Sequence, residues 1–281
     1  MLTLKKIFYT SRPRFWLYLA GPFLVGYVAG MSQVTQLATA QFWIYFLYFL
    51  FPANVFLYGI NDLADSDTDQ YNDKKKNYEH PVRVEERSQL KKVMLLCICL
   101  SMVLCFFTLN GVLSLLLLLL LFFSYAYSMS PWRWKAKPFI DSSSNILYII
   151  PGVFGFFLTT GKFPALPILG AAGLWSAGMH LFSAIPDIDA DRRAGLLTTA
   201  VFFGKEKSLI ICILLWFSAW VSIMNYSHNL WCVPLLVYAI IPLLTLIKKW
   251  EVMRVYKIFP ALNGCVGFGL FWFITIQRFF S

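Results

Sequence analysis

Long apolar runs alternate with short polar breaks along almost the whole chain. Nine of these runs are predicted to be membrane-spanning helices: 15–31, 40–60, 91–108, 111–128, 139–159, 165–185, 207–225, 229–247 and 259–278. Each is close to the roughly 20 apolar residues that cross a bilayer. If one run is re-entrant, the count falls to eight. No polar stretch is long enough to fold separately, so residues 1–281 are predicted to be one all-α integral membrane domain.

The composition agrees with lipid as the solvent. Hydrophobic residues make up 59% of the chain and charged residues 14%, against about 25% charged residues in a typical soluble domain. The six cysteines form no Cys-x-x-Cys pair, which argues against a zinc site or a disulfide framework. The net charge of +10 is assigned to membrane orientation and anionic headgroups, not to nucleic acid.

The positions of the charged residues predict the orientation. With the N-terminus in the cytoplasm, all of the 24 basic residues except Lys162 and Arg278 fall on the cytoplasmic side, as the positive-inside rule requires. All 14 acidic residues lie at that side as well. We therefore expect the chemistry, and any active site, at the cytoplasmic face. A transporter would more often carry ionisable groups at the membrane midplane.

An acidic motif follows the second predicted span. It contains Asn61, Asp62, Asp65 and Asp69, and its carboxylates share one face if the helix continues. Like charges repel at this spacing unless a cation holds them, and carboxylate oxygens suit Mg²⁺. The motif lacks the later Gly and Glu of an EF-hand. The alternative interpretation is a solvated acidic loop.

A second acidic motif ends the sixth predicted span. Asp187 and Asp191 are four residues apart and share a helical face. Two such clusters can hold two Mg²⁺ ions, whose coordination is usually completed by phosphate oxygens. A diphosphate also needs cations, and Arg133 and Lys135 in the fourth-to-fifth loop are the main candidates. Lys74 and Arg192 are weaker candidates, and all four are also explained by membrane orientation alone.

Together these motifs resemble the signatures of the UbiA superfamily of intramembrane prenyltransferases. The first motif reads Asn-Asp-x-x-Asp-x-x-x-Asp and the second Asp-x-x-x-Asp, and the resemblance covers nearly the whole chain. The run from Tyr127 to Lys135, followed by Asp141 and Asn145, is similar to a third region of the family. The residues around Tyr58 and Asp187 look most like the carotenoid (lycopene) elongase branch. Many aromatic-acceptor members carry an Arg-x-x-Arg-Pro segment where this chain has 72–76 and 80–81, which fits that branch better than a quinone-precursor enzyme.

The resemblance implies helices around a central pocket that opens to lipid and is capped by cytoplasmic loops. It implies Mg²⁺-dependent transfer of a prenyl group from an allylic diphosphate, with dimethylallyl diphosphate favoured, to a lipophilic acceptor taken from the membrane. Lycopene, in C50 carotenoid biosynthesis, is the expected acceptor, while an aromatic quinone precursor or another lipid stays open. The implied metal ligands are Asp62, Asp65, Asp69, Asp187 and Asp191.

The remaining candidates follow from the chemistry of an allylic cation. Asn61, Arg133 and Lys135 would contact the diphosphate, which carries the developing negative charge. The cation needs a dry pocket with electron-rich faces, for which Tyr58, Tyr127 and Tyr148 are candidates, with ordinary packing as the alternative. His180 lies seven residues before Asp187 and would face the pocket or be a buried structural histidine. Asn145 is a further pocket candidate.

Other classes of protein remain as alternatives. A membrane phosphotransferase also uses aspartates and Mg²⁺, but the usual CDP-alcohol signature is not evident. A cation transporter would place charges within the membrane. A non-catalytic scaffold has no need for both acidic motifs.

Overall fold

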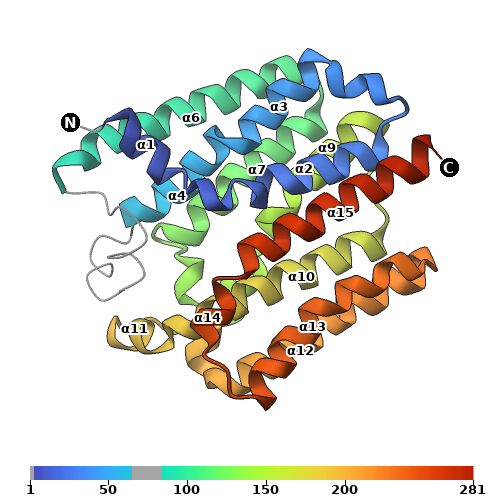
Figure 1. Ribbon diagram of the computed structural model, residues 1–281. Helices are drawn as coiled ribbons and strands as arrows, with labels where there is room; N and C mark the ends of the chain where they lie inside the picture. Colours follow the sequence, from blue (N-terminus) through green and yellow to red (C-terminus); the bar gives the residue numbers. More distant parts are fainter. Residues whose placement is uncertain (1–2, 65–83, 281) are drawn as a thin grey trace. The chain divides into compact units, whose positions relative to one another are not determined.

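The computed structural model describes residues 3–64 and 84–280, and Figure 1 traces them along the sequence. Within these ranges all of the regular secondary structure is helical. The chain forms two compact units. Unit 1 comprises 1–132, 150–163 and 267–281, and unit 2 comprises 133–149 and 164–266. Of the predicted site residues, Asp65, Asp69 and Lys74 lie outside the described residues.

Eight helical segments in the described part of the chain are long and apolar enough to cross a membrane. They are Ala40–Ala64, Arg87–Thr108, Gly111–Ser128, Ile140–Thr160, Leu166–Arg193, Thr199–Ser227, Leu230–Ile247 and Val252–Phe279. The prediction of an all-α integral membrane protein is confirmed. The first predicted span is a shorter apolar helix, Leu17–Gly30, so the count of nine spans and the orientation of the N-terminus stay predictions. The single domain also stays a prediction.

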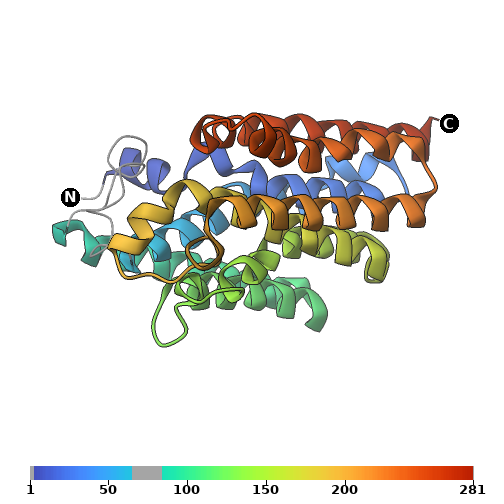
Figure 2. The ribbon, with the colours of Figure 1, turned by 90° about the horizontal axis from the view of Figure 1, so that it is seen from below.

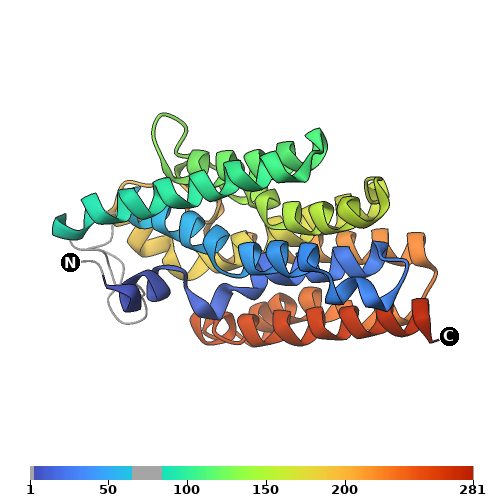
Figure 3. The ribbon, with the colours of Figure 1, turned by 90° about the horizontal axis from the view of Figure 1, so that it is seen from above.

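Unit 1 contains most of the N-terminal half. Its elements are α1 (Leu4–Thr10), η1 (Pro13–Phe15), α2 (Leu17–Gly30), η2 (Val34–Ala38), α3 (Ala40–Leu50), α4 (Pro52–Ala64), η4 (Val84–Glu86), α6 (Arg87–Thr108), α7 (Gly111–Ser128) and α9 (Ile150–Thr160). α3 ends before Phe51, and Pro52 starts α4. Figure 3 shows the two helices in succession, in blue and light blue. α6 and α7 form a hairpin, and the Asn110 side chain caps α7 at its start.

Glycines allow α2 and α9 of unit 1 to pack closely. A Cβ atom at Gly155 would lie 2.6 Å from the carbonyl oxygen of Phe23, and one at Gly26 would clash with the backbone of Gly152. Small residues at such contacts are how membrane helices gain close packing where lipid offers no hydrophobic drive. Beside this contact, the rings of Phe23 and Phe154 pack with that of Phe49, at 5.3 and 5.4 Å between centroids.

Unit 2 contains most of the C-terminal half. Its elements are η5 (Trp134–Ala136), α8 (Ile140–Ser143), η6 (Ser144–Ile149), α10 (Leu166–Ala184), η7 (Ile185–Asp187), α11 (Ile188–Arg193), α12 (Thr199–Ser227), η8 (Leu230–Leu236), α13 (Val237–Ile247), α14 (Val252–Tyr256) and the first turns of α15 (Phe259–Phe279). α12 packs against both α10 and α13 (Figure 2).

The core of unit 2 is centred on Trp216. Its indole is 2% exposed and donates from Nε1 to the carbonyl of Trp175 at 3.0 Å. A Cβ atom at Gly178 would lie 2.7 Å from that Nε1, so the glycine lets the indole approach α10. The same core includes Ile185 and Ile188 together with Val255 and Phe259. It therefore joins the turn that carries Asp187 to α14 and the start of α15.

Candidate functional site

The described part of the first acidic motif lies at the C-terminal end of α4. The Asp62 side chain is 10% exposed and its Oδ1 accepts a hydrogen bond from Arg12 Nη2 at 2.9 Å. The Arg12 guanidinium also lies over the Tyr58 ring, 4.6 Å from the centroid. Arg12 has a left-handed backbone (φ 51°) between α1 and η1. A planar cation thus contacts both a motif carboxylate and a predicted pocket aromatic.

Asn61 links this motif to the end of α7. Its Nδ2 donates to Ser128 Oγ at 3.3 Å, and Ser128 is the last residue of α7. Tyr127 precedes Ser128 and is partly buried. The first motif and the start of the predicted third region therefore lie together within unit 1.

The N-terminal segment makes a second contact of the same kind. Lys6 on α1 pairs with Glu86 of η4, and the Glu86 side chain is 8% exposed. Segment 4–12 thus holds α4 through Asp62 and η4 through Glu86. Each pair neutralises a carboxylate that is largely shielded from solvent, where an unpaired charge would be costly.

The second acidic motif lies in unit 2 where α10 gives way to η7 and α11. Asp187 ends η7 and Asp191 lies in α11. Both are partly buried, whereas the Asp189 side chain between them is 85% exposed and pairs with Arg192 at 3.5 Å. This difference supports the prediction that Asp187 and Asp191 share a face. Arg192 lies with Asp189 on the exposed side.

The turn after α11 returns the chain to Asp191. Gly195 adopts φ 69°, a conformation that favours glycine. The amide of Leu196 donates to the Asp191 carbonyl at 2.9 Å. Thr198, the N-cap of α12, then donates its hydroxyl to Asp191 Oδ2 at 3.4 Å. The Asp191 carboxylate is therefore held by a residue only seven positions further along the sequence.

Asp141 is the centre of a buried network in unit 2. Its side chain is fully buried and accepts hydrogen bonds from the amides of Ser142 (2.6 Å) and Thr199 (2.7 Å) and from the Thr199 hydroxyl. His180 Nε2 lies 4.0 Å from Asp141 Oδ2. The Asn145 side chain donates to the Asp141 carbonyl at 2.8 Å. A carboxylate with several donors is satisfied without an ion pair.

The same network holds the loop that carries the candidate phosphate-binding cations. The amide of Phe139 donates to the Thr199 hydroxyl at 2.6 Å, a few residues after Lys135. Lys135 is 8% exposed. Arg133 has a left-handed backbone (φ 38°), and its Nε and Nη2 atoms are buried without a hydrogen-bond partner among the described residues. Buried guanidinium donors of this kind fit an anion.

The predicted site residues therefore fall into two groups in the described chain. Unit 1 brings Asn61 and Asp62 together with Tyr58, and unit 2 brings His180 and Asn145 to Asp141. Tyr148 lies in η6 and is partly buried. That both groups bind one diphosphate stays a prediction. The sequence did not predict their partners, because Arg12, Thr198 and Thr199 are ordinary residue types outside any motif, and Ser128 lies in the third region but was given no role there.

The donor set fits the predicted metal. Asp62, Asp187 and Asp191 offer carboxylate oxygens, which Mg²⁺ prefers. Within residues 3–64 and 84–280, no three His, Cys, Asp or Glu side chains gather as a metal-binding group. Mg²⁺ is commonly bound by one or two carboxylates and completed by substrate phosphate, so the residues present can hold it beside a diphosphate.

Fold and site define a helical membrane protein whose described motif aspartates, Asp62, Asp187 and Asp191, lie near helix ends. Residues 19–274 match the UbiA prenyltransferase family, and the chain belongs to that family. It is a membrane prenyltransferase.

Two relatives and one solved structure are similar to nearly the whole chain. The chain is 39% identical to a lycopene elongase/hydratase of Haloarcula japonica, over 92% of this chain and 86% of that protein. It is 38% identical to one of Halobacterium salinarum, over 93% of this chain and 94% of that protein. Among solved structures, a UbiA homolog from Archaeoglobus fulgidus bound to DMAPP and Mg²⁺ has a TM-score of 0.68 at 23% identity. That match covers 95% of this chain and 99% of the other, and it shows the fold.

Proposed function

We propose that this chain transfers the dimethylallyl group of dimethylallyl diphosphate to lycopene, in a Mg²⁺-dependent reaction at the cytoplasmic face of the membrane. The observation that carries the proposal is the identity of 38–39%, over more than nine-tenths of the chain, with proteins named lycopene elongase/hydratase. The acidic motifs and the buried Arg133 donors supply the chemistry that an allylic diphosphate requires.

The reaction balances as follows. The bond between C1 of the allyl group and the bridging oxygen breaks, and its electron pair leaves with the diphosphate. A terminal alkene of lycopene forms the new carbon–carbon bond to C1, which leaves a cation on the acceptor. That cation loses a proton to give an alkene, or takes up water and loses a proton to give an alcohol. The word hydratase in the relatives' names favours testing for both products.

The chain's own residues bind and orient the diphosphate in this proposal. Arg133 and Lys135 contact its oxygens, and Asn61 contacts the diphosphate or the metal. Mg²⁺ would be held by Asp62, Asp187 and Asp191, together with Asp65 and Asp69, which lie outside the described residues. When bound, Mg²⁺ stabilises the negative charge on the leaving group. Lys74, also undescribed, and the exposed Arg192 are secondary phosphate contacts.

The pocket residues have a different task. Tyr58 and Tyr127 in unit 1, and Tyr148 in unit 2, offer electron-rich faces to the allylic cation. His180 is the candidate proton acceptor, and its Nε2 lies near the Asp141 carboxylate, which would stabilise the protonated ring. Asn145 orients the backbone of Asp141.

The test uses the purified chain in liposomes that contain lycopene and labelled dimethylallyl diphosphate. We expect a carotenoid longer than lycopene, formed with Mg²⁺ but not after chelation, and absent for the double variant Asp62→Ala, Asp187→Ala. The matched control is Asp189→Asn, because Asp189 lies between the motif aspartates but is exposed. Metal-dependent transfer to an aromatic acceptor, with lycopene unchanged, would refute the acceptor. No transfer from any allylic diphosphate by folded protein would refute the proposal as a whole.

A further inference from the structure

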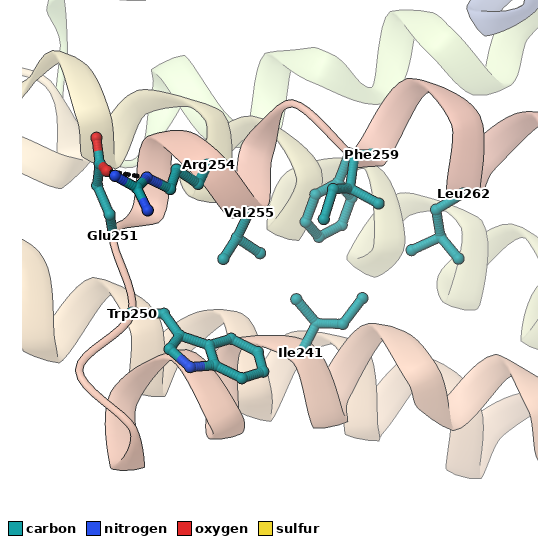
Figure 4. A pocket seen from close by; sticks show the side chains of 8 residues that line it. Ile241, Trp250, Glu251, Arg254, Val255, Phe259 and Leu262 are labelled. Atoms are coloured by element: carbon teal, nitrogen blue, oxygen red, sulfur yellow. Dashed lines mark ion pairs between the residues drawn. The ribbon is translucent and has the colours of Figure 1, made fainter.

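A groove of about 320 Å³ lies within unit 2 and contains none of the motif residues. It is lined by Ile241 of α13 and by residues of the segment from Trp250 to Leu262, which contains α14 and the start of α15 (Figure 4). This volume is at the lower end of the roughly 300–1,000 Å³ of ligand pockets. The groove can thus hold a slender ligand or part of a larger one.

The groove is apolar along its length and charged at one end. Val255, Phe259 and Leu262 line one wall, with Ile241 and Trp250 opposite (Figure 4). The ion pair of Glu251 and Arg254 marks the end nearest α14 (Figure 4). An apolar groove with charged residues at one end matches an amphiphile that has an alkyl chain and a polar headgroup.

The segment that contains this ion pair is net positive, although its lysines do not line the groove themselves. Residues 248–257 contain one acidic residue, Glu251, against four basic ones, Lys248, Lys249, Arg254 and Lys257. All five are exposed. Arg254 pairs with Glu251 through Nε at 2.6 Å, and its side chain is still 84% exposed. The rest of the Arg254 guanidinium therefore remains accessible, and its planar set of N–H donors suits phosphate oxygens.

We propose that this groove binds an anionic phospholipid. One acyl chain lies between Ile241 and Phe259, and the phosphate contacts Arg254 beside the neighbouring lysines. A zwitterionic phospholipid would bring its own cation to a basic edge, so it binds less well. The aromatic ring of Trp250 suits the boundary between acyl chain and headgroup. The proposal is independent of the prenyl acceptor.

Lipid in the groove would also stabilise the second acidic motif. Val255 and Phe259 belong to the same buried core as Ile185 and Ile188, and these two isoleucines flank the turn at Asp187. A ligand that binds only the folded protein raises its stability by mass action. We therefore expect anionic lipid to protect this core against unfolding.

The test compares phosphatidylglycerol with phosphatidylcholine of the same acyl chains, added to the full chain in a neutral detergent. Native mass spectrometry measures retained lipid, and thermal unfolding measures stabilisation. We expect phosphatidylglycerol to bind about tenfold more tightly than phosphatidylcholine, as a charge-assisted contact allows, and to raise the unfolding temperature. Arg254→Gln removes most of this preference and Arg254→Lys retains part of it. The control Lys162→Gln removes an exposed charge outside the groove and changes nothing.

A second pair of variants tests the acyl chain. Ile258→Trp fills the groove, whose lining includes this exposed residue, and should abolish retention of phosphatidylglycerol. Ile276→Trp makes the same change at an exposed α15 position outside the groove and should have no effect. Equal retention of the two lipids, or a preference that survives both Arg254→Gln and Ile258→Trp, would overturn the proposal. Loss with Ile258→Trp but no headgroup preference would overturn the anionic assignment.

Discussion

The two acidic motifs are stabilised in different ways. In unit 1, Asp62 is held by a cation, Arg12, fifty residues away in sequence. In unit 2, Asp191 is held by the neutral hydroxyl of Thr198, and the nearby buried Asp141 by the amide and hydroxyl of Thr199. An ion pair can exchange its partner for a metal ion, whereas a hydrogen-bonded network fixes geometry. Asp62 is therefore electrostatically adjustable, and Asp191 is rigidly positioned.

The largest expected effect is a loss of kcat when a motif aspartate is replaced, compared with no loss when its exposed neighbour Asp189 is replaced. Asp187→Asn removes a proposed metal ligand, and we expect kcat to fall by roughly 10²–10³-fold, similar to the loss of one strong electrostatic contact in a transition state. Asp189→Asn, two residues along, should leave kcat unchanged. Steady-state kinetics at saturating Mg²⁺ measure both. Equal losses would mean that the partly buried face of this turn is not the functional one.

A second substitution tests the rigid network. Asp141→Asn replaces an acceptor of several hydrogen bonds by a group that also donates, which leaves buried donors unsatisfied. We expect the free energy of unfolding to fall by about 2 kcal/mol. Thermal unfolding in detergent measures the loss. Thr199→Ser retains the hydroxyl and should cost less than Thr199→Val, and the reverse order would contradict the network.

The third prediction tests the adjustable ion pair. Arg12→Gln removes the guanidinium that competes with the metal ion for the Asp62 carboxylate, and we expect about a tenfold fall in the Mg²⁺ concentration needed for half-maximal rate, as for the loss of one charged hydrogen bond. The protein should stay folded. Arg14→Gln is the control, since Arg14 is exposed and packs over the Phe15 ring. A fall in kcat alone would place Arg12 in the reaction itself.

The smallest effect concerns the link between α4 and α7. Ser128→Ala removes the acceptor of the Asn61 amide, and we expect a loss of about 1 kcal/mol in the free energy of unfolding. Ser143→Ala, at an exposed position of α8, should cost less. Chemical denaturation of the two variants side by side would decide, and an equal cost would mean that the Asn61 contact contributes no stability.

Hydropathy predicted the helical class and the approximate spans, because lipid requires long apolar segments with internally paired backbones. It did not predict where helices break. Phe51 and Pro52 divide a continuous apolar run into α3 and α4. Because of the turn at Arg12 and η1, α2 begins only at Leu17. Breaks of this kind depend on local backbone geometry, which average hydropathy does not register.

The motifs predicted the aspartates, but not what holds them. Asp141 and Thr199 are 58 residues apart, and Asn61 and Ser128 are 67 apart. Such pairs arise from tertiary packing, and Arg12 looked like one more charge for membrane orientation. Asp65, Asp69 and Lys74 stay predictions.

The paired contacts of segment 4–12 have a practical consequence for labelling and purification. Lys6 and Arg12 attach this segment to Glu86 and to Asp62. A bulky fusion joined directly before this segment would therefore disturb the ion pair of the Asp62 carboxylate. A fluorescent protein or affinity handle placed there should impair the enzyme unless a flexible spacer precedes Leu4.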